Sequence, residues 1–552
     1  MEQPTPSIPD AVSNAAVPVS APPEWTPLRI ARVAAAGLAV AVSAWLISIT
    51  VWSVVHCVPG ELVYDGMGGA VVDHCVRIRE GRPIYAEPDD SFMPLLYTPL
   101  YYYLCTATMT VLGEGPVACR VTSTVLIGLS VVVLMSLVRR ITRSNWAALL
   151  VLPMACAAYG QTRFYFTEPR VDPAAALMIM LSVWSAIRFR GLAAAILTGV
   201  FLSLAFWSKQ STAIFSAMFL LGLLQDGFKR ALAAAITFGV AVLLSTWTAT
   251  RLTDGWFWTF IVELGRHHGF PLERLARTAR MDWAGPLLWP ALALPTLLVS
   301  FTATARRPGP GKEAERGIRL LITSILALGV YSLVSRANVG STPKPLIPVS
   351  LLMAGAIPIG LWRITQIGSS LAWRRSSAVL VACLAAAYLY SQVFPVSESL
   401  PSAERAENWA RIMAKVCDAA DEGPVWVTPF GYVTTRMPGQ QMRPTLVAVE
   451  DYVGGRFGPL TGREIPPPLA DKIAAGYFHT IVLPIRRVDR PLENLLEQYY
   501  RVETTIDGLE DDTAPASNKL GFFRPTKKLK KDPPPRRAKN RKPPPGRPRR
   551  GR

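Results

Sequence analysis

The strongest constraint on this chain is a series of apolar runs, each about long enough to cross a lipid bilayer. A membrane-spanning helix needs roughly 20 apolar residues, within a range of about 17–25. Such runs lie near residues 31–55, 117–138, 146–163, 173–188, 192–208, 211–225, 231–250, 285–304, 318–335, 345–362 and 378–394. Only 18% of the residues are charged, whereas a soluble protein has about a quarter. We therefore predict an α-helical polytopic membrane protein with about 11 membrane-spanning helices.

Basic clusters between the runs predict an orientation. They lie at 139–143, 188–190, 228–230, 305–319 and 373–375, all on one side of the predicted bundle. The positive-inside rule assigns this side, together with the N-terminus, to the cytoplasm. The acid-bearing loops then face outward; they lie at 56–116, 164–172, 251–284 and 336–344. We expect a multi-pass protein of the cell membrane, with everything after residue 394 on the extracytoplasmic side.

One further apolar segment, PLYYYLCTATMTVLG (99–113), tests this topology. Counting it as a span would reverse every later loop and put the basic clusters outside. We therefore predict that it forms an interfacial or re-entrant helix within the first loop, with its tyrosines at the level of the lipid headgroups.

Changes in composition divide the chain into four parts. Residues 1–27 are rich in Pro, Ala and Ser and are expected to be a disordered cytoplasmic segment. Residues 28–394 contain the apolar runs. In 395–523 the short β-like runs PVWVTPF, TIVLP and TLVAV alternate with polar helical stretches, which predicts a small extracytoplasmic α/β domain.

The fourth part, 524–552, is a basic, Pro-rich tail. It carries 14 Lys/Arg and one Asp, and so accounts for 13 of the 19 net positive charges of the chain. It is expected to be a solvated arm, either simply disordered or in contact with anionic lipids or wall polymers. Because the rest of the chain is only mildly basic, no nucleic-acid partner is expected.

The seven cysteines show no spacing typical of a zinc site, so no metal ligands are assigned, although a divalent metal in the reaction stays open. Cys57 and Cys75 bracket the first loop and would be able to pair there in an oxidising compartment. The alternative is that they are buried, unpaired thiols.

The first loop reads ELVYDGMGGAVVDHCVRIREGRPIY (61–85) and offers two acids for catalysis. Asp65 follows the first span and precedes a Gly-rich stretch that we expect to be flexible, and Asp73 lies eight residues further on. A carboxylate just outside the membrane is suited to act as general base toward an acceptor hydroxyl or amine. The alternative for either acid is a solvated loop position.

A second group of charges lies at YFTEPRVDPAAAL (165–177) and FWSKQST (206–212). Asp172 before Pro173 is a good helix start, so it is either a helix cap or a functional acid. Arg170 carries a guanidinium suited to phosphate. Lys209 lies between two spans, where it either extends to the headgroups or binds a lipid-linked phosphate.

Further charges lie on the same predicted side. His267 and His268 follow the seventh run, and Arg336 and Lys344 lie between the ninth and tenth. Adjacent histidines on a helix point about 100° apart, which gives little support to a two-histidine metal site. The clustering of charges near one headgroup plane fits an anionic lipid-linked substrate. A transporter or a flippase of lipid-linked glycans is the alternative, but it usually carries charges at mid-span.

In the order of these motifs the chain resembles the GT-C membrane glycosyltransferases, which include lipid A aminoarabinose transferases and protein O-mannosyltransferases. The resembling elements are Asp65, IREGRPIY (78–85), YTPLYYYL (97–104), Arg120, VDPAAALMIMLSVW (171–184), WSKQSTAIFS (207–216) and FWTFIVELGRHHGF (257–270). The similarity covers about residues 28–360. The chain departs from the family pattern at Gly66, where a second acid is often found, and at Thr98, where some members have lysine.

The resemblance implies transfer of a sugar from a polyprenyl-phosphate donor to a lipid, glycan or protein acceptor, with inversion. It implies that Asp65 is the base or acceptor anchor, that Asp172 is a second essential acid, and that Arg170 and Lys209 bind phosphate. Asp73 remains the alternative base.

Overall fold

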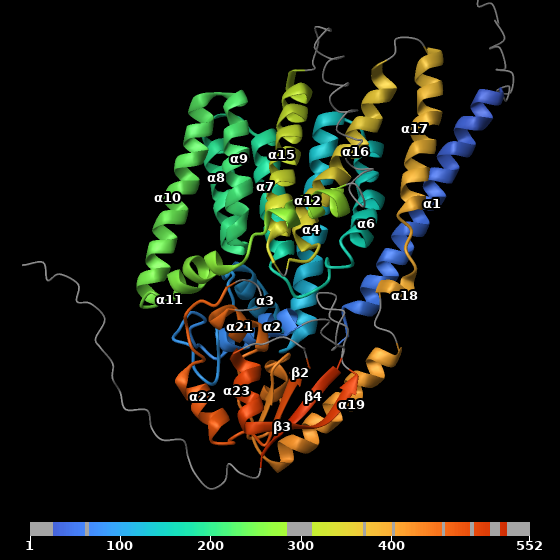
Figure 1. Cartoon of the computed structure of the whole chain (residues 1–552). Coiled ribbons are helices and arrows are strands. Elements are labelled where there is room, and N and C mark those ends of the chain that lie inside the picture. Colours follow the sequence, from blue (N-terminus) through green and yellow to red (C-terminus); the bar gives the residue numbers. More distant parts are fainter. Residues whose placement is uncertain are drawn as a thin grey trace, which may run out of the picture.

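The structure is a computed structural model in which long helices stand side by side and a small sheet-containing domain lies at one end of them (Figure 1). It describes residues 26–60, 66–283, 312–339, 341–367, 371–399, 403–454, 459–485, 491–507 and 519–526. The N-terminal segment before residue 26, Asp65, the expected span at 285–304 and the tail after residue 526 lie outside the described residues.

The helical bundle accounts for the other ten predicted apolar runs. Its helices are α1 Pro27–Cys57, α4 Pro116–Thr142, α5 Asn145–Leu149, α6 Val151–Gln161, α7 Asp172–Arg188, α8 Gly191–Ser208, α9 Ala213–Gly222, α10 Phe228–Leu252, α15 Lys312–Ala337, α16 Ile347–Ile367 and α17 Leu371–Ser391. Several start with proline in the first turn, where its missing N–H costs no hydrogen bond. Within the described residues six helices are long and apolar enough to cross a membrane, or up to seven if a bent pair counts as one. The protein is therefore a multi-pass membrane protein, and the count of 11 stays a prediction.

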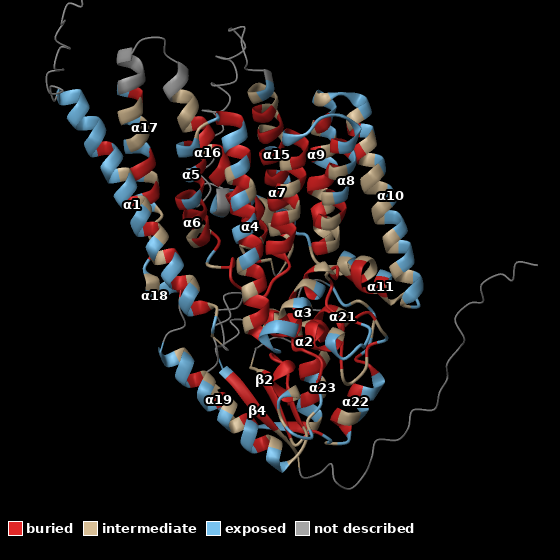
Figure 2. Ribbon diagram, turned by 180° about the vertical axis from the view of Figure 1, so that it is seen from behind, coloured by how far each residue is buried: buried red, intermediate tan, exposed pale blue. Residues whose placement is uncertain are grey.

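The outermost helices turn apolar side chains outward. In their most apolar windows only 22% of α1 and 11% of α10 is buried, and both helices show exposed faces in Figure 2. Leu38 and Val40 of α1, and Leu243 and Leu244 of α10, are among the exposed side chains. Such surfaces suit lipid tails, because a helix that is apolar all round must be covered by protein or by lipid.

The first loop is folded into two helices, α2 (Gly66–Arg79) and α3 (Leu100–Leu112), which lie between the bundle and the small domain (Figure 1). With 13 residues, α3 is about 20 Å long, too short for a hydrocarbon core of about 30 Å. This agrees with the predicted non-spanning helix. The expected flexibility of the Gly-rich stretch is wrong, because these glycines belong to α2. A Cβ on Gly69 would lie 3.0 Å from the Pro429 carbonyl oxygen, so glycine allows the helix to approach the small domain closely.

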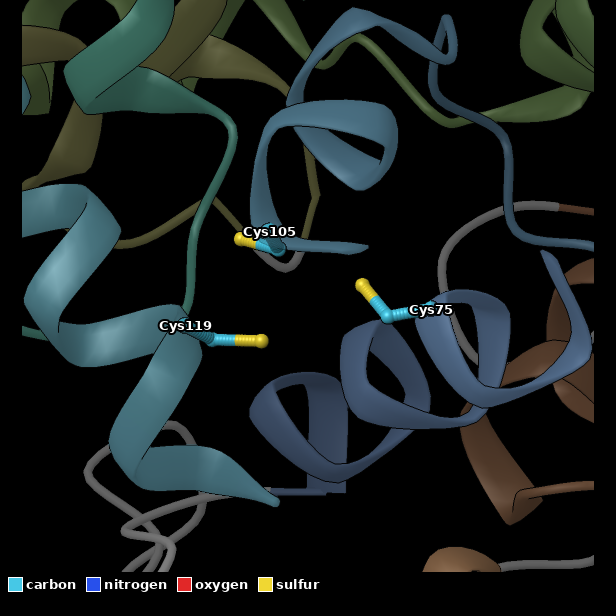
Figure 3. A group of neighbouring side chains, drawn as sticks. All are labelled: Cys75, Cys105 and Cys119. Carbon is cyan, nitrogen blue, oxygen red and sulfur yellow. The ribbon is translucent and has the colours of Figure 1, made fainter. Parts of the chain in front are cut away.

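Three helices of this region meet at three cysteines. Cys75 of α2, Cys105 of α3 and Cys119 of α4 are fully buried, and their sulfurs lie within 4.8 Å of one another (Figure 3). Cys57 lies elsewhere and donates a hydrogen bond to the Ser399 carbonyl oxygen, with a distance of 2.9 Å. The possible pairing of Cys57 with Cys75 is therefore not found, and the buried-thiol alternative holds for both.

The small domain is α/β, as predicted. Its four strands are β1 Val425–Val427, β2 Thr480–Pro484, β3 Tyr500–Asp507 and β4 Lys519–Pro525, in the order β1-β2-β4-β3, with β1 and β2 parallel and the other pairs antiparallel. Its helices are α18 Val396–Ser399, α19 Ala403–Glu422, α20 Tyr432–Thr435, α21 Leu446–Val453, α22 Pro467–Ala474 and α23 Pro491–Tyr499.

One predicted strand of this domain is wrong. The run TLVAV belongs to helix α21, which follows Thr445 in extended conformation. Its buried side chains include Leu446, Val449 and Val453, at helical spacing against the core shared with the first loop. A short apolar run fits a strand or a buried helix equally well, so its tertiary packing decides.

The small domain and the first loop share one hydrophobic core. At their edge the Asp90 carboxylate pairs with both Arg443 and Lys472. Arg443 also lies over the Phe478 ring, 5.4 Å from its centroid. The two parts therefore form a single folded body next to the bundle.

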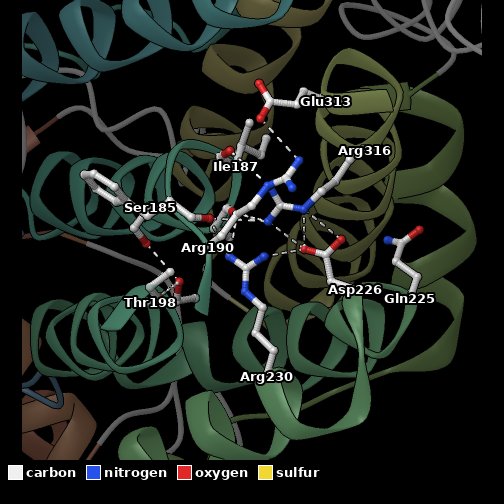
Figure 4. A network of polar contacts seen from close by, with 12 residues as sticks. Ser185, Ile187, Arg190, Thr198, Gln225, Asp226, Arg230, Glu313 and Arg316 are labelled. Carbon is white, nitrogen blue, oxygen red and sulfur yellow. Dashed lines mark hydrogen bonds and ion pairs between the residues drawn. The ribbon is translucent and has the colours of Figure 1, made fainter. Parts of the chain in front are cut away.

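The basic clusters gather at the bundle end opposite the small domain, as predicted for one membrane side. Arg140 and Arg190 pair with Glu313 at 3.0 and 3.2 Å. Deeper in the same end, Asp226 pairs with Arg230 at 2.5 Å and Arg316 at 2.8 Å (Figure 4).

Arg230 and Arg316, which both pair with Asp226, also donate hydrogen bonds to the Ala186 carbonyl oxygen, at 2.5 and 2.6 Å. Cations at the C-terminal end of a helix are favourable because the last carbonyl groups there lack intrahelical partners. Asp226 therefore holds Arg230 of α10 and Arg316 of α15 against the C-terminal end of α7.

We expect Asp226→Asn to lower the free energy of unfolding by about 3 kcal/mol, because it leaves two buried guanidinium groups without their anion. The side chain of Asp226 is only 4% exposed. Glu313→Gln is the matched control: its carboxylate is 48% exposed, so its loss should cost less than about 1 kcal/mol. Unfolding in detergent, followed by circular dichroism, measures both. Equal losses of unfolding free energy in Asp226→Asn and Glu313→Gln would contradict the role of Asp226 as the anion that holds the two arginines.

Candidate functional site

The central feature of the site is an ion pair at the start of α7. The Lys209 ammonium donates a hydrogen bond to Asp172 Oδ1, and the Nζ–O distance is 2.7 Å. The two side chains are 11% and 4% exposed. Helix α7 begins at Asp172 itself, with Val171 in the N-cap position and proline in the first turn. The carboxylate therefore binds the lysine and is not the helix cap that the sequence allowed.

Lys209 occupies a break between α8 and the short helix η1 (Gln210–Thr212), where its backbone is extended. Burial alone would lower its pKa, but the Asp172 charge and the nearby Tyr331 and Tyr97 raise the pKa of Lys209 above its usual value. The lysine therefore stays charged. Burial raises the pKa of Tyr97 to about 12, so its hydroxyl remains a neutral donor.

A second buried ion pair, between Arg120 and Glu168, lies close by, because Glu168 is in the loop that leads to Asp172. Arg120 near the start of α4 is 3.5 Å from Glu168 Oε1, and the same guanidinium donates to the carbonyl oxygens of Cys57 and Gly60 at 3.1 and 2.5 Å. Arg120 thus connects the end of α1, through Cys57 and Gly60, to the loop before α7. Burial raises the pKa of Glu168, and Arg120 and Lys344 counteract the shift.

The backbone between the two acids is held by hydroxyl groups. Ser123 donates to the Glu168 carbonyl oxygen at 2.7 Å, and the Arg170 N–H donates to Tyr101 Oη at 3.1 Å. Tyr101 Oη is in turn 2.6 Å from Ser123 Oγ. Arg170, buried in this segment, therefore has a fixed backbone two residues before Asp172.

The YTPL motif completes the support. The Thr98 hydroxyl donates to the Phe206 carbonyl oxygen at 2.8 Å, and the Gln210 amide donates to the Leu96 carbonyl oxygen. These bonds tie the first loop to the chain on either side of Lys209. The Lys344 ammonium lies 4.8 Å from the Tyr165 ring centroid, beside the same loop. Among the described residues, the cationic side chains of Arg120, Arg170, Lys209 and Lys344 therefore lie in or beside the segment that contains Glu168 and Asp172.

The other predicted ligands do not form one group. His267 Nδ1 lies 3.1 Å from the Glu263 carbonyl oxygen within the loop after α10, and Arg336 donates to the Ser341 carbonyl oxygen at 2.5 Å after the end of α15. His268 Nε2 lies 3.4 Å from Asp451 Oδ1, and this contact links the loop after α10 to the small domain.

We expect the contact between His268 and Asp451 to weaken as the pH rises. Burial alone would lower the pKa of His268, but Asp451 raises it above the ordinary value of 6.5. The stabilising charge is therefore fully present below about pH 6.5 and is lost as the pH passes the raised folded-state pKa.

Hydrogen exchange of α21 measures this, with faster exchange expected at pH 8.5 than at 5.5 after correction for the intrinsic rate. His268→Gln should remove the difference, whereas His267→Gln should keep it. An unchanged pH dependence in His268→Gln would contradict the assignment of the effect to the contact between His268 and Asp451.

The two loop-one acids have different positions. Asp65 lies outside the described residues, directly before α2. Asp73 is buried where α2 meets the small domain, and the Tyr432 N–H donates to it. Burial raises the pKa of the Asp73 carboxyl well above its usual range.

Several residues of the site could not be identified from the sequence, because tertiary packing alone brings them to the site. Tyr97, Tyr331 and Asp451 were not singled out, although the first belongs to the YTPL motif and is affected electrostatically by Asp172, Lys209 and Asp451. Arg120 was named only as an element of the family resemblance, without a role in the site. The available signal for Arg120 was its position inside an otherwise apolar run, because a charged residue in a membrane-spanning segment costs free energy and is usually kept for a function.

Fold and site together define a polytopic membrane protein with a buried charged site where the bundle meets the first loop and the small domain. The fold is similar to that of ArnT from Cupriavidus metallidurans in the apo state, with a TM-score of 0.57 and 13% identity over 90% of this chain and 99% of that chain. It is also similar to ArnT from the same organism bound to undecaprenyl phosphate, with a TM-score of 0.54 and 13% identity over 89% and 99% of the two chains. The expected GT-C-like fold is thus confirmed. No protein-family model matches the sequence, and no curated protein matches it.

Proposed function

We propose that this protein is a membrane glycosyltransferase that moves a sugar from a polyprenyl-phosphate donor to a lipid, glycan or protein acceptor, with inversion. The observation that carries the proposal is the buried pair of Asp172 and Lys209, 2.7 Å apart, in a fold shared with a protein whose structure is bound to undecaprenyl phosphate.

The cations beside Asp172 suit the leaving group. When the acceptor attacks the anomeric carbon, the bond from that carbon to the phosphate oxygen breaks and negative charge grows on the polyprenyl phosphate. Lys209 and Arg170 are the groups that we propose to bind this phosphate, with Lys344 nearby. Fixed cations aimed at a developing charge lower the barrier, because they need no reorganisation during the reaction.

Asp65 is the proposed general base, which removes the acceptor proton as the new bond forms. Two observations support it over Asp73. Asp73 is buried against the small domain, and burial raises the pKa of its carboxyl, which disfavours the charged form that would accept the proton. Gly60, the last described residue before Asp65, is bonded to Arg120, which pairs with Glu168.

Reaction on the extracytoplasmic face is part of the proposal. The basic clusters, Arg140 and Arg190 among them, gather at the opposite end of the bundle, which the positive-inside rule assigns to the cytoplasm. His268, which contacts the small domain, and with it His267 and Arg336, are proposed to contact the sugar or the acceptor. A single displacement at the anomeric carbon accounts for the inversion.

Binding of undecaprenyl phosphate by the purified protein tests the donor class without knowledge of the sugar. We expect Lys209→Met to weaken binding by about tenfold or more, since it removes a charge-assisted hydrogen bond to the phosphate. Lys229→Met is the matched control, because Lys229 is exposed at the opposite end of the bundle. Undecaprenol, which lacks the phosphate, should bind equally to all three proteins.

Transfer of radiolabelled sugar in proteoliposomes then tests the reaction, with a panel of polyprenyl-phosphate pentoses and hexoses and an extract of envelope lipids and glycans as acceptors. Vesicles without the protein are the blank. Failure to bind undecaprenyl phosphate in preference to undecaprenol would overturn the proposed donor.

A further inference from the structure

A cluster of three thiols lies behind the site and is not used by the proposed reaction. Cys75, Cys105 and Cys119 come from three different helices, each with its side chain fully buried. Their sulfurs all lie within 4.8 Å of one another (Figure 3). The three residues are far apart in the sequence, so the packing of α2, α3 and α4 creates this arrangement.

The spacing matches a three-coordinate metal centre. With metal–thiolate bonds of about 2.3 Å, three sulfurs around one ion lie about 4 Å apart. Among the residues that the structure describes, the group holds no histidine nitrogen and no carboxylate oxygen. Structural zinc is almost always four-coordinate, whereas Cu(I) is a soft ion that thiolates select and that three sulfurs satisfy. We propose that Cys75, Cys105 and Cys119 bind one Cu(I) ion.

The other buried cysteines show what sets this group apart. Cys57 and Cys156 are also buried but are not part of such a group. A disulfide would join only two of the three sulfurs, at about 2.05 Å, and leave the third unused. A metal ion uses all three. Each thiol that becomes a thiolate ligand releases its proton to solvent, so the apparent affinity should increase with pH.

The position of the cluster gives the ion a structural consequence. Tyr101, one turn before Cys105 in α3, donates to the Cys119 carbonyl oxygen at 3.1 Å. The same hydroxyl accepts the bond from the Arg170 N–H. An ion bound by all three helices would therefore stabilise the backbone at Arg170, two residues before Asp172. The proposed role is to stabilise the site, without contact with the substrate.

The test uses the full chain in detergent, reduced and under anaerobic conditions, with the exposed Cys383 and Cys417 replaced by serine to remove adventitious thiols. Cu(I) is titrated against a chromogenic Cu(I) chelator. We expect one ion per chain, three sulfur ligands by X-ray absorption, and a rise in the midpoint of thermal unfolding on loading. Cys105→Ser should lower the affinity at least about 100-fold. The matched control Cys156→Ser, at another buried thiol, should not change it.

Several outcomes would overturn the proposal. One is stoichiometric Cu(I) binding by Cys105→Ser, and another is Zn²⁺ binding in place of Cu(I). A disulfide among the three cysteines, detected by alkylation and mass spectrometry of the unreduced protein, would also exclude the site. X-ray absorption of the parent protein needs no cluster variant, so fewer than three sulfur ligands would count against it even if Cys105→Ser fails to fold.

Discussion

Asp172→Asn should reduce sugar transfer at least about 100-fold, because it leaves Lys209 without the charge that orients it. Small displacements of a positioning group typically cost this much in rate. The substitution should also destabilise the protein by about 3–5 kcal/mol, since the buried Lys209 ammonium loses the carboxylate with which it is paired. Transfer rates at saturating and limiting donor, together with thermal unfolding, measure the two effects.

A double variant separates the chemical effect from the structural one. Asp172→Asn with Lys209→Met removes both charges, so it should recover much of the lost stability but none of the activity. If Asp172→Asn kept its transfer activity while its stability fell, the acid would be structural only. The proposed role in orienting Lys209 would then be wrong.

The second large effect is expected at the proposed base. General-base catalysis contributes about 10²–10⁴-fold, so Asp65→Asn should lose a factor of this size in the maximal rate, with little change in donor binding. Asp73→Asn should have a much smaller effect, because Asp73 is buried against the small domain, where burial disfavours its charged form.

Both variants are compared in proteoliposomes at matched protein content, with undecaprenyl phosphate binding as the test of folding. The reverse result, with activity lost in Asp73→Asn and kept in Asp65→Asn, would move the base to Asp73. Activity retained in both would exclude the first loop as its source.

Local chemistry accounts for the elements that the sequence predicted well. Helix α19 coincides with the polar stretch AERAENWARIMAKVCDAADE (403–422), and the apolar runs coincide with bundle helices. Where local patterns were ambiguous, packing decided. The run TLVAV became a helix, and the glycines before Asp73 became points of close contact with Pro429.

The candidate site was predictable only in part. Asp172, Arg170 and Lys209 were chosen because charges at the ends of apolar helices are costly unless they are used. Their pairing was not predictable, since Asp172 and Lys209 are separated by 37 positions in the chain. Arg120 and Glu168 are separated by 48 positions.

The sequence by itself determined the class of this protein, because the length and polarity of a membrane-spanning helix are properties of one continuous segment. It also determined that its basic clusters would share one end of the bundle. Only the tertiary structure decided which acid meets which cation, and that Cys75, Cys105 and Cys119 face one another. Such contacts depend on how separate helices pack, and a linear pattern of residues does not specify that packing.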